Sequence, residues 1–246
     1  KYRSKIGVSA KAAGKGIAFL RDDGGGKGVL FVKLFPVDPK GTYAIQGFGN
    51  AGQRAALLHQ ELLGGGKLIA VCDSRGGVYN AKGLSPRELV THKLKTGSVV
   101  GFPGAQEIPR DSVLEMQVDV LYPAALENSI NENNAASINA RIVCELANGP
   151  VTPEADAILH SKGVHIIPDI LASAGGVTVS YFEMVQDSYS YFWDEGLIQQ
   201  RLDATLSKAY HTVQEAIREK RVHPRLAAMV VGVARVAEAC KLRGWV

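Results

Sequence analysis

Short runs of β-branched and aliphatic residues alternate with longer amphipathic stretches along much of the chain. The short runs are bounded by Gly, Pro, Asp or Asn, which is typical of parallel strands buried on both faces. We therefore expect strands at residues 42–47, 67–73, 118–124, 141–146 and 164–169. The amphipathic stretches between them predict helices at residues 50–63, 85–95, 131–138 and 153–162.

This alternation indicates right-handed βαβ crossovers. The predicted fold class is therefore α/β, with a Rossmann-type, doubly wound and mostly parallel sheet. After residue 175 the pattern is helical, at residues 176–186, 194–219 and 224–242, and predicts a C-terminal helical tail. We expect three parts: a connector and domain entry over 1–40, a Rossmann dinucleotide-binding core over 41–175, and a helical segment over 176–246 that completes the domain and lines the cleft.

The composition is that of an ordinary globular protein, with 246 residues of which 46% are hydrophobic and 21% charged. No apolar run approaches the roughly 20 residues of a membrane span, and the first residues lack the apolar region of a secretion signal. We expect a cytoplasmic protein without a membrane partner. The net charge of +4 is spread without a basic stripe, so we expect no nucleic-acid partner.

The three cysteines, Cys72, Cys144 and Cys240, lie far apart in the sequence. Their number is odd and they are embedded in apolar strings such as "IAVCD" and "RIVCEL". This setting favours buried reduced thiols over disulfides or metal ligands, so we expect no metal site.

Three glycines follow the first predicted strand in the segment "GFGNAG". Gly47, Gly49 and Gly52 match the G-x-G-x-x-G pattern, at the point where a strand ends and a helix begins. The first glycine permits a tight turn, the second lets a pyrophosphate approach the main chain, and the third lets the helix lie close to the strand. The unpaired amides and positive dipole of the helix N-terminus favour the phosphate charge. The segment predicts a dinucleotide site, the alternative being an ordinary tight turn.

Asp73 ends the second predicted strand, about 20 residues after the glycines, where a carboxylate can accept hydrogen bonds from a ribose 2'-hydroxyl. It would face the 2'-phosphate of NADP with like charge, which favours NAD as the cofactor. Ser74 and Arg75 follow directly, however, and a hydroxyl and a guanidinium could accommodate that phosphate. NADP or dual use therefore stays open.

Two further segments bear on the substrate. Asn148 follows the fourth predicted strand, at the carboxyl edge of the sheet where ligands bind in open α/β folds. The segment "GGVTVSY" opens a helix and contains Ser180. Spacing alone favours a helix-surface hydroxyl for Ser180.

The motifs "AIQGFGNAG", "CDSRGGVYNAKGL", "VDVLYPAALEN", "ELANGPVTPEAD", "GGVTVSYFEMVQ" and "RGWV" occur in this order from about residue 41 to the C-terminus. Together they resemble the nucleotide-binding, C-terminal domain of hexameric glutamate dehydrogenases. The resemblance implies NAD(P)-dependent oxidative deamination of L-glutamate to 2-oxoglutarate and ammonia, in a homo-oligomer that the family forms as a hexamer.

The resemblance also implies residue roles. It places Phe48, Asn50 and Ala51, beside the glycines, at the cofactor pyrophosphate, and Asp73 and Ser74 at the adenine ribose. The remaining residues that it implies are Ala124 and Ala125 at the adenosine and linking ribose, Asn148 at the nicotinamide ribose, and Val177 and Ser180 at the substrate, with Ser180 on its γ-carboxylate.

The lysines and the aspartate that perform the chemistry in this family belong to its other domain, and no such segment matches here. We therefore name no catalytic residue and expect the chain to supply the cofactor-binding half of the enzyme. The alternative is a non-catalytic NAD-binding module that acts as a sensor or an assembly element.

Overall fold

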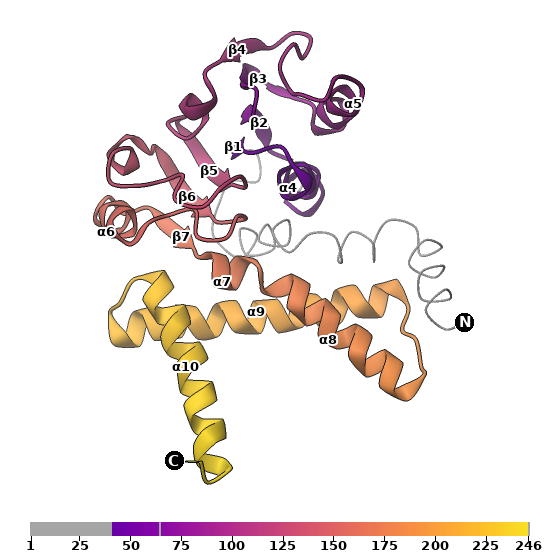
Figure 1. Cartoon of the computed structure of the whole chain (residues 1–246), viewed down its shortest axis with the longest axis vertical. Coiled ribbons are helices and arrows are strands. Elements are labelled where there is room, and N and C mark those ends of the chain that lie inside the picture. The colour runs from indigo at the N-terminus through magenta and orange to yellow at the C-terminus, as the bar shows by residue number, and fades with distance from the viewer. Residues whose placement is uncertain (1–40, 64, 246) are drawn as a thin grey trace.

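The sheet is the centre of the molecule. A computed structural model describes residues 41–63 and 65–245, so the predicted connector at 1–40 lies outside the described residues. Seven strands lie in the order β4-β3-β2-β1-β5-β6-β7 (Figure 1). They are β1 (Thr42–Gln46), β2 (Lys67–Cys72), β3 (Gly77–Leu84), β4 (Gln106–Ile108), β5 (Val118–Pro123), β6 (Ala140–Cys144) and β7 (His165–Ile167).

The five predicted strands form a continuous parallel set, β2-β1-β5-β6-β7. β3 pairs antiparallel with β2, and β4 pairs antiparallel with β3. The sheet is therefore mostly parallel, and the predicted fold class is confirmed.

Helices cover both faces of the sheet and form the C-terminal region. They are α4 (Asn50–Leu62), α5 (Pro86–Thr96), α6 (Pro153–Ser161), α7 (Asp169–Ala172), α8 (Ala174–Tyr189), α9 (Glu195–Lys220) and α10 (Pro224–Leu242), with 3-10 turns η2 (Arg110–Val113) and η3 (Ala135–Ser137). Several begin as their sequences require. Ser85 accepts a hydrogen bond from the Glu88 amide before α5, and Thr152 accepts one from the Ala155 amide before α6. A proline then occupies the first turn of each.

Two separate apolar cores lie on opposite faces of the sheet. Alternation along β1 contributes to both: Tyr43 and Ile45 pack with residues of α4, α5 and the C-terminal helices, whereas Ala44 packs with residues of α6, η2 and η3. All three side chains are fully buried. β1 therefore fixes both layers of helices relative to one sheet.

A polar group lies inside the first core. The Nδ1 atom of His59 lies 2.9 Å from the Tyr122 hydroxyl, and the Tyr43 ring stacks on the imidazole with centroids 3.7 Å apart. Burial lowers the pKa of His59 to about 3, so the ring is neutral at ordinary pH. The core thus holds a hydrogen-bonded but uncharged histidine.

The cysteines are all free thiols. Cys72 and Cys144 are buried as predicted, and burial raises the pKa of Cys72 to about 11. The prediction is wrong for Cys240, which is only half-buried because it lies near the end of α10.

The predicted helix at 131–138 is wrong, because only the 3-10 turn η3 forms there. Asparagine side chains compete with a helix in this segment. The Asn131 side chain accepts a hydrogen bond from the Asn133 amide, and the Asn134 side chain accepts one from the Asn131 amide. Such local bonds replace the helical ones.

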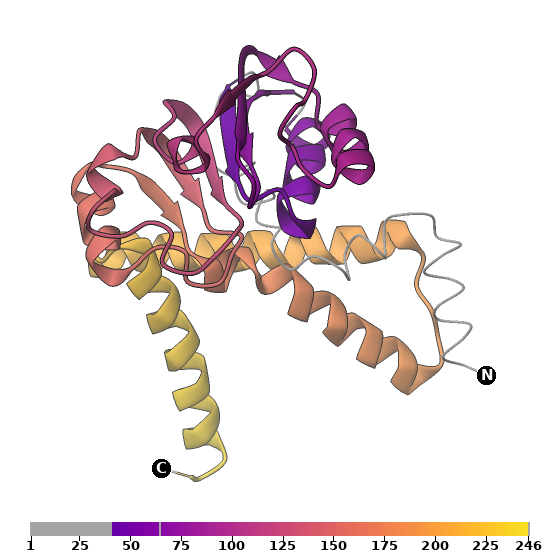
Figure 2. The same ribbon diagram turned by 45° about the horizontal axis from the view of Figure 1, so that its top comes forward.

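The C-terminal helices leave the sheet after β7. Both views show α9 running beneath the sheet and α10 extending away from it (Figures 1 and 2). Within the described part of the chain, no helix is long and apolar enough to cross a membrane. Among residues 41–63 and 65–245, no group of three His, Cys, Asp or Glu side chains is arranged to hold a metal ion.

Candidate cofactor site

β1 and β5 are neighbours in the sheet, although β2, β3 and β4 lie between them in the sequence. The strand order therefore reverses between β1 and β5, and ligands of open α/β sheets bind at the carboxyl ends of the strands at such a point. The glycine turn follows β1, and the segment "YPAAL" covers the last two residues of β5 and the start of the loop after it. The topology thus brings two sequence-predicted segments to one place.

The turn at Gly47 is wedged between two strand ends. Its amide donates to the Cys72 carbonyl at the end of β2, at 3.1 Å. Its φ is +95°, and a Cβ there would lie 2.8 Å from both the Ala124 carbonyl group and the Ala125 Cβ. Only glycine fits this conformation and this space. Gly47 therefore sets the distance between the turn and Ala124 and Ala125.

Gly49 caps α4 at the exposed end of the turn. The first intrahelical bond runs from the Gln53 amide to the Gly49 carbonyl, at 2.9 Å. The amides of Asn50, Ala51 and Gly52 precede that bond, as expected for the free donors of a helix N-terminus. A Cβ at Gly49 would meet no atom within 4 Å. The cradle is open on this side, so these residues fit a pyrophosphate.

Phe48 has a different place from its neighbours. Its side chain is fully buried in the first core, while its carbonyl accepts a hydrogen bond from the Gln53 side chain at 3.0 Å. The Phe48 side chain thus cannot contact a ligand in this conformation.

Asp73 lies at the end of β2 and is only 7% exposed. One carboxylate oxygen accepts from the Arg75 amide and the Ser98 hydroxyl, at 3.0 and 3.1 Å. The other accepts from the Lys93 ammonium and the Val99 amide, at 2.9 and 2.8 Å. A carboxylate offers about four lone-pair positions, so a ribose hydroxyl would have to replace one of these donors.

The charge of Asp73 is compensated inside the protein. Burial opposes its ionisation, but hydrogen bonds from Lys93 and from the Arg75 and Val99 amides outweigh burial and hold the Asp73 pKa below its ordinary value. Ser74 and Arg75 are exposed beside it. Sequence reasoning missed Lys93 and Ser98, which reach Asp73 from α5 and from the loop after it.

Asn148 is exposed in the loop after β6, while its neighbours are fixed. The Ala147 amide donates to the Pro123 carbonyl at 2.9 Å, next to Ala124. The Gly149 amide donates to the Asp169 carboxylate at 2.8 Å. The loop thus presents Asn148 at the carboxyl edge of the sheet, beside the segment that holds the glycine turn.

Val177 and Ser180 lie on α8, away from these strand ends in the sequence. Val177 is 70% exposed, and the Ser180 hydroxyl, also exposed, makes no hydrogen bond within the described part of the chain. Tyr181 and Met184 continue this exposed face, at 57% and 59%. The structure brings the glycine turn into direct contact with Ala124 and Ala125, and it places Asp73 and Asn148 in the loops that follow β2 and β6. The two predicted substrate residues occupy a separate helix face.

Comparisons with known proteins agree with this geometry. The sequence model described as Glutamate/Leucine/Phenylalanine/Valine dehydrogenase matches residues 32–244. A glutamate dehydrogenase of Thermotoga maritima is 45% identical over 243 residues, which are 96% of this chain and 58% of that protein.

Solved structures give the same result. The hetero-hexameric glutamate dehydrogenase of Thermus thermophilus, in its leucine-bound form, is 30% identical with a TM-score of 0.82, over 91% of this chain and 54% of that one. The glutamate dehydrogenase of Peptoniphilus asaccharolyticus is 33% identical with a TM-score of 0.77, over 92% and 54%. This chain spans little more than half the length of these relatives. Because the family model covers most of its residues, the chain belongs to the Glutamate/Leucine/Phenylalanine/Valine dehydrogenase family.

Proposed function

We propose that this chain is the cofactor-binding half of an NAD(P)-dependent glutamate dehydrogenase. The observation that carries the proposal is the open glycine turn at the reversal of strand order, with Gly49 facing free space beside the α4 N-terminus. The 45% identity to a glutamate dehydrogenase supports the choice of substrate. The reaction is L-glutamate, water and oxidised cofactor giving 2-oxoglutarate, ammonium, reduced cofactor and a proton.

In this proposal the pyrophosphate lies against Gly47, Gly49 and Gly52 and the backbone of the residues between and after them. These are Phe48, Asn50 and Ala51. Amide donors at a helix N-terminus bind an anion without needing a cationic side chain. Ala124 and Ala125 border the adenosine and linking ribose in this proposal, directly beside the turn, where Ala125 is exposed.

Asn148 binds the nicotinamide ribose in this proposal, and Asp73 and Ser74 bind the adenine ribose. NAD is the preferred cofactor because the Asp73 carboxylate disfavours a second anion. Of the two side-chain donors to Asp73, Lys93 is 20% exposed at its side chain and Ser98 is 3% exposed, so the Lys93 ammonium is the one more easily displaced by a ribose hydroxyl. Lys93 and Arg75 would bind the 2'-phosphate where NADP is used.

Val177 and Ser180 contact the substrate in the proposed complete enzyme, and the free Ser180 hydroxyl donates to the γ-carboxylate of glutamate. The bound nicotinamide ring supplies a hydride acceptor for the substrate Cα. The base that activates water and the cations that hold the α-carboxylate come from the rest of the enzyme. We propose a cytoplasmic homo-oligomer, a hexamer as in the resembled family, with neither nucleic acid nor membrane as a partner.

The test compares this chain with the chain plus a separately expressed substrate domain of a related glutamate dehydrogenase. Calorimetry should detect NAD binding to the chain alone. With saturating glutamate and NAD, the absorbance of NADH should stay flat for the chain alone and rise once the second domain is added, because orienting two reactants accounts for roughly 7 to 11 kcal/mol of the barrier. Steady turnover by the chain alone, abolished by Gly49→Val, would contradict the assignment of the chemistry to the missing half.

Binding of NAD without turnover in either mixture would favour the alternative, a non-catalytic NAD-binding module. Failure to bind NAD or NADP would contradict both.

A further inference from the structure

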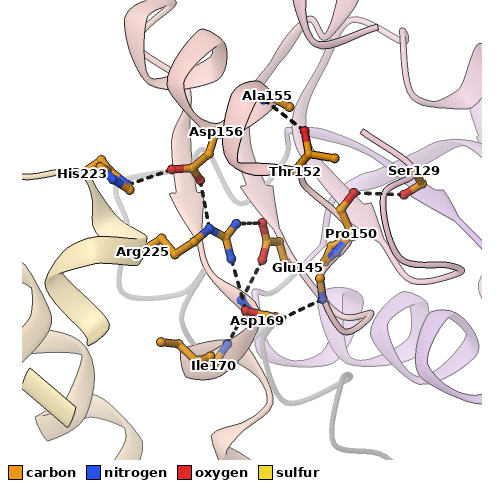
Figure 3. A network of polar contacts seen from close by, with 11 residues as sticks. Ser129, Glu145, Pro150, Thr152, Ala155, Asp156, Asp169, Ile170, His223 and Arg225 are labelled. Atoms are coloured by element: carbon orange, nitrogen blue, oxygen red, sulfur yellow. Dashed lines mark hydrogen bonds and ion pairs between the residues drawn. The ribbon is translucent and has the colours of Figure 1, made fainter. Parts of the chain in front are cut away.

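Arg225 joins three carboxylates from different elements near the start of α10 (Figure 3). Its guanidinium contacts Glu145 at the end of β6, Asp156 on α6 at 3.3 Å, and Asp169 at the start of α7 at 3.2 Å. The side chain of Arg225 is 14% exposed, and that of Glu145 is fully buried. One largely buried cation therefore connects α10 to α6, to α7 and to the residue that follows β6.

The partners of Arg225 lead in two directions. Asp156 leads to helices: it belongs to α6 and also contacts His223, next to α10, at 2.7 Å. Asp169 leads to the candidate cofactor site. One of its oxygens contacts Arg225 (Figure 3). The other accepts from the Gly149 amide at 2.8 Å. The same guanidinium thus makes two separate contacts. The Asp169 contact connects α10 to the loop of Gly149, and the Asp156 contact connects α10 to α6.

Glu145 also fixes the position of Asp169. Glu145 accepts a hydrogen bond from the Asp169 amide at 2.8 Å, with its second oxygen on Arg225. Burial raises the pKa of Glu145 to about 7, against the lowering effect of Arg225. Removing the cation would leave buried carboxylates facing one another, which is strongly unfavourable. Arg225 therefore binds one oxygen of the Asp169 carboxylate while the other oxygen accepts from the Gly149 amide.

Gly149 adopts the left-handed conformation, with φ of +55°, and its carbonyl accepts from the Asn128 amide at 2.8 Å. Both sides of Asn148 are fixed by hydrogen bonds, on Ala147 and on Gly149, while Asn148 is exposed. The backbone direction at Asn148 consequently depends on the bond from Gly149 to Asp169.

We propose that Arg225 and Asp169 are positioning residues, which set the Asn148 loop from α10 and thereby the affinity for the nicotinamide half of the dinucleotide. The inference rests on the proposed function, in which Asn148 binds the nicotinamide ribose. It adds that a helix outside the sheet controls one half of the cofactor site and leaves the other half alone, because within the described residues no hydrogen bond or ion pair joins Arg225 or Asp169 to Asp73 or to the glycine turn.

The experiment uses the chain as it stands, with NAD and with ADP, which carries only the adenine half. Asp169→Ala should weaken NAD binding roughly tenfold, as for a lost hydrogen bond to a charged group, and leave ADP binding within about twofold. Asp156→Ala is the matched control at the other contact. It should lower the melting temperature while changing neither affinity.

Asp169→Asn retains one oxygen that can accept from the Gly149 amide, but it turns an NH2 donor towards the Arg225 guanidinium. Its NAD affinity should therefore lie between those of the wild type and Asp169→Ala. Arg225→Lys keeps the charge but cannot span three carboxylates, so it should resemble Asp169→Ala. Amide exchange gives an independent readout: the Gly149 amide should lose protection in Asp169→Ala while amides of α6 keep theirs.

Three results would overturn the inference. Asp169→Ala could weaken NAD and ADP binding equally, it could leave NAD binding unchanged, or it could change NAD affinity by the same factor as Asp156→Ala. A wild-type chain that binds ADP but not NAD would contradict the proposed function, and the inference with it. Asn148→Ala separates the two: if that change weakens NAD and Asp169→Ala does not, the proposed function stands and only the positioning role fails.

Discussion

A Cβ at Gly52 would lie 1.9 Å from the carbonyl oxygen of Gly47. The third glycine of the motif is therefore required by the protein itself, because α4 begins in direct contact with the turn. Gly49 differs, since a side chain there would meet nothing within 4 Å. Gly52 is thus required by the fold, whereas Gly49 leaves space for the ligand.

Gly49→Ala should therefore fold but bind poorly. We expect its free energy of unfolding to change by less than about 1 kcal/mol, the cost of alanine at a helix N-cap. NAD binding should weaken at least about tenfold, because the Cβ occupies the approach of the pyrophosphate. Gly52→Ala should destabilise the fold by more than about 2 kcal/mol. Thermal unfolding measures the stability of each variant, and calorimetry measures its NAD affinity. The division of roles would be refuted if Gly49→Ala were the less stable variant and Gly52→Ala the weaker NAD binder.

Lys93 and Asp73 should affect cofactor choice in opposite directions. Lys93→Met leaves the Asp73 charge without its cation, so the ratio of NAD to NADP affinity should rise roughly tenfold. Asp73→Asn removes the charge while keeping an acceptor oxygen, so the same ratio should fall. Calorimetric titration of each variant with both cofactors gives the ratios. Shifts in the same direction would show that charge at this position does not discriminate.

Ser180→Ala should weaken glutamate use in the enzyme reassembled with a substrate domain. A hydroxyl that donates to a carboxylate contributes about 1.5 to 3 kcal/mol, so kcat/KM for glutamate should fall roughly tenfold to a hundredfold. NAD affinity should not change. Ser188→Ala is the control on the same helix, because the Ser188 hydroxyl already donates to the Met184 carbonyl at 2.8 Å. Equal kinetics for the two variants would assign Ser180 to an ordinary exposed position.

His59 should make the fold acid-sensitive. Its pKa is about 3 in the folded chain, below the ordinary value of 6.5, so the unfolded chain binds the proton more readily. Its contribution to stability is therefore present above pH 6.5 and decreases as pH falls towards 3, by about 1.4 kcal/mol per pH unit. Glu145 acts in the opposite sense: its raised pKa stabilises the fold at low pH, and this contribution is lost as pH rises through about 7.

The comparison that isolates His59 is therefore between the wild type and a variant at each pH. His59→Phe combined with Tyr122→Phe removes both polar partners without leaving either unpaired. Denaturant unfolding between pH 4 and pH 7 should give a difference in stability that shifts in favour of the variant as pH falls. A constant difference would mean that His59 takes up its proton in the folded state.

The parallel strands could be predicted because their apolar runs carry the signal locally. β3 could not, since "GVYNAKGL" is exposed over part of its length and shows no continuous apolar run. β4 has three largely exposed residues and exists only through its pairing with β3. Such strands depend on a neighbour that no local pattern reveals.

The candidate site divides in the same way. Spacing and glycine pattern were enough for Gly47, Gly49, Gly52 and Asp73 as candidates. The ammonium and the hydroxyl that bind Asp73 lie 20 and 25 residues further along the chain. Arg225 lies 80 residues from Glu145. A charged residue that is buried in the fold needs a partner, but the sequence does not identify that partner.

The sheet ends in very short strands on both sides. β4 and β7 each have three residues, and α10 packs near β7. An incoming chain would find only a few free backbone donors and acceptors at either edge, too few for a stable added strand. If copies of this chain associate, we therefore expect helix faces to carry the contact, and the sheet to remain seven strands wide within each copy.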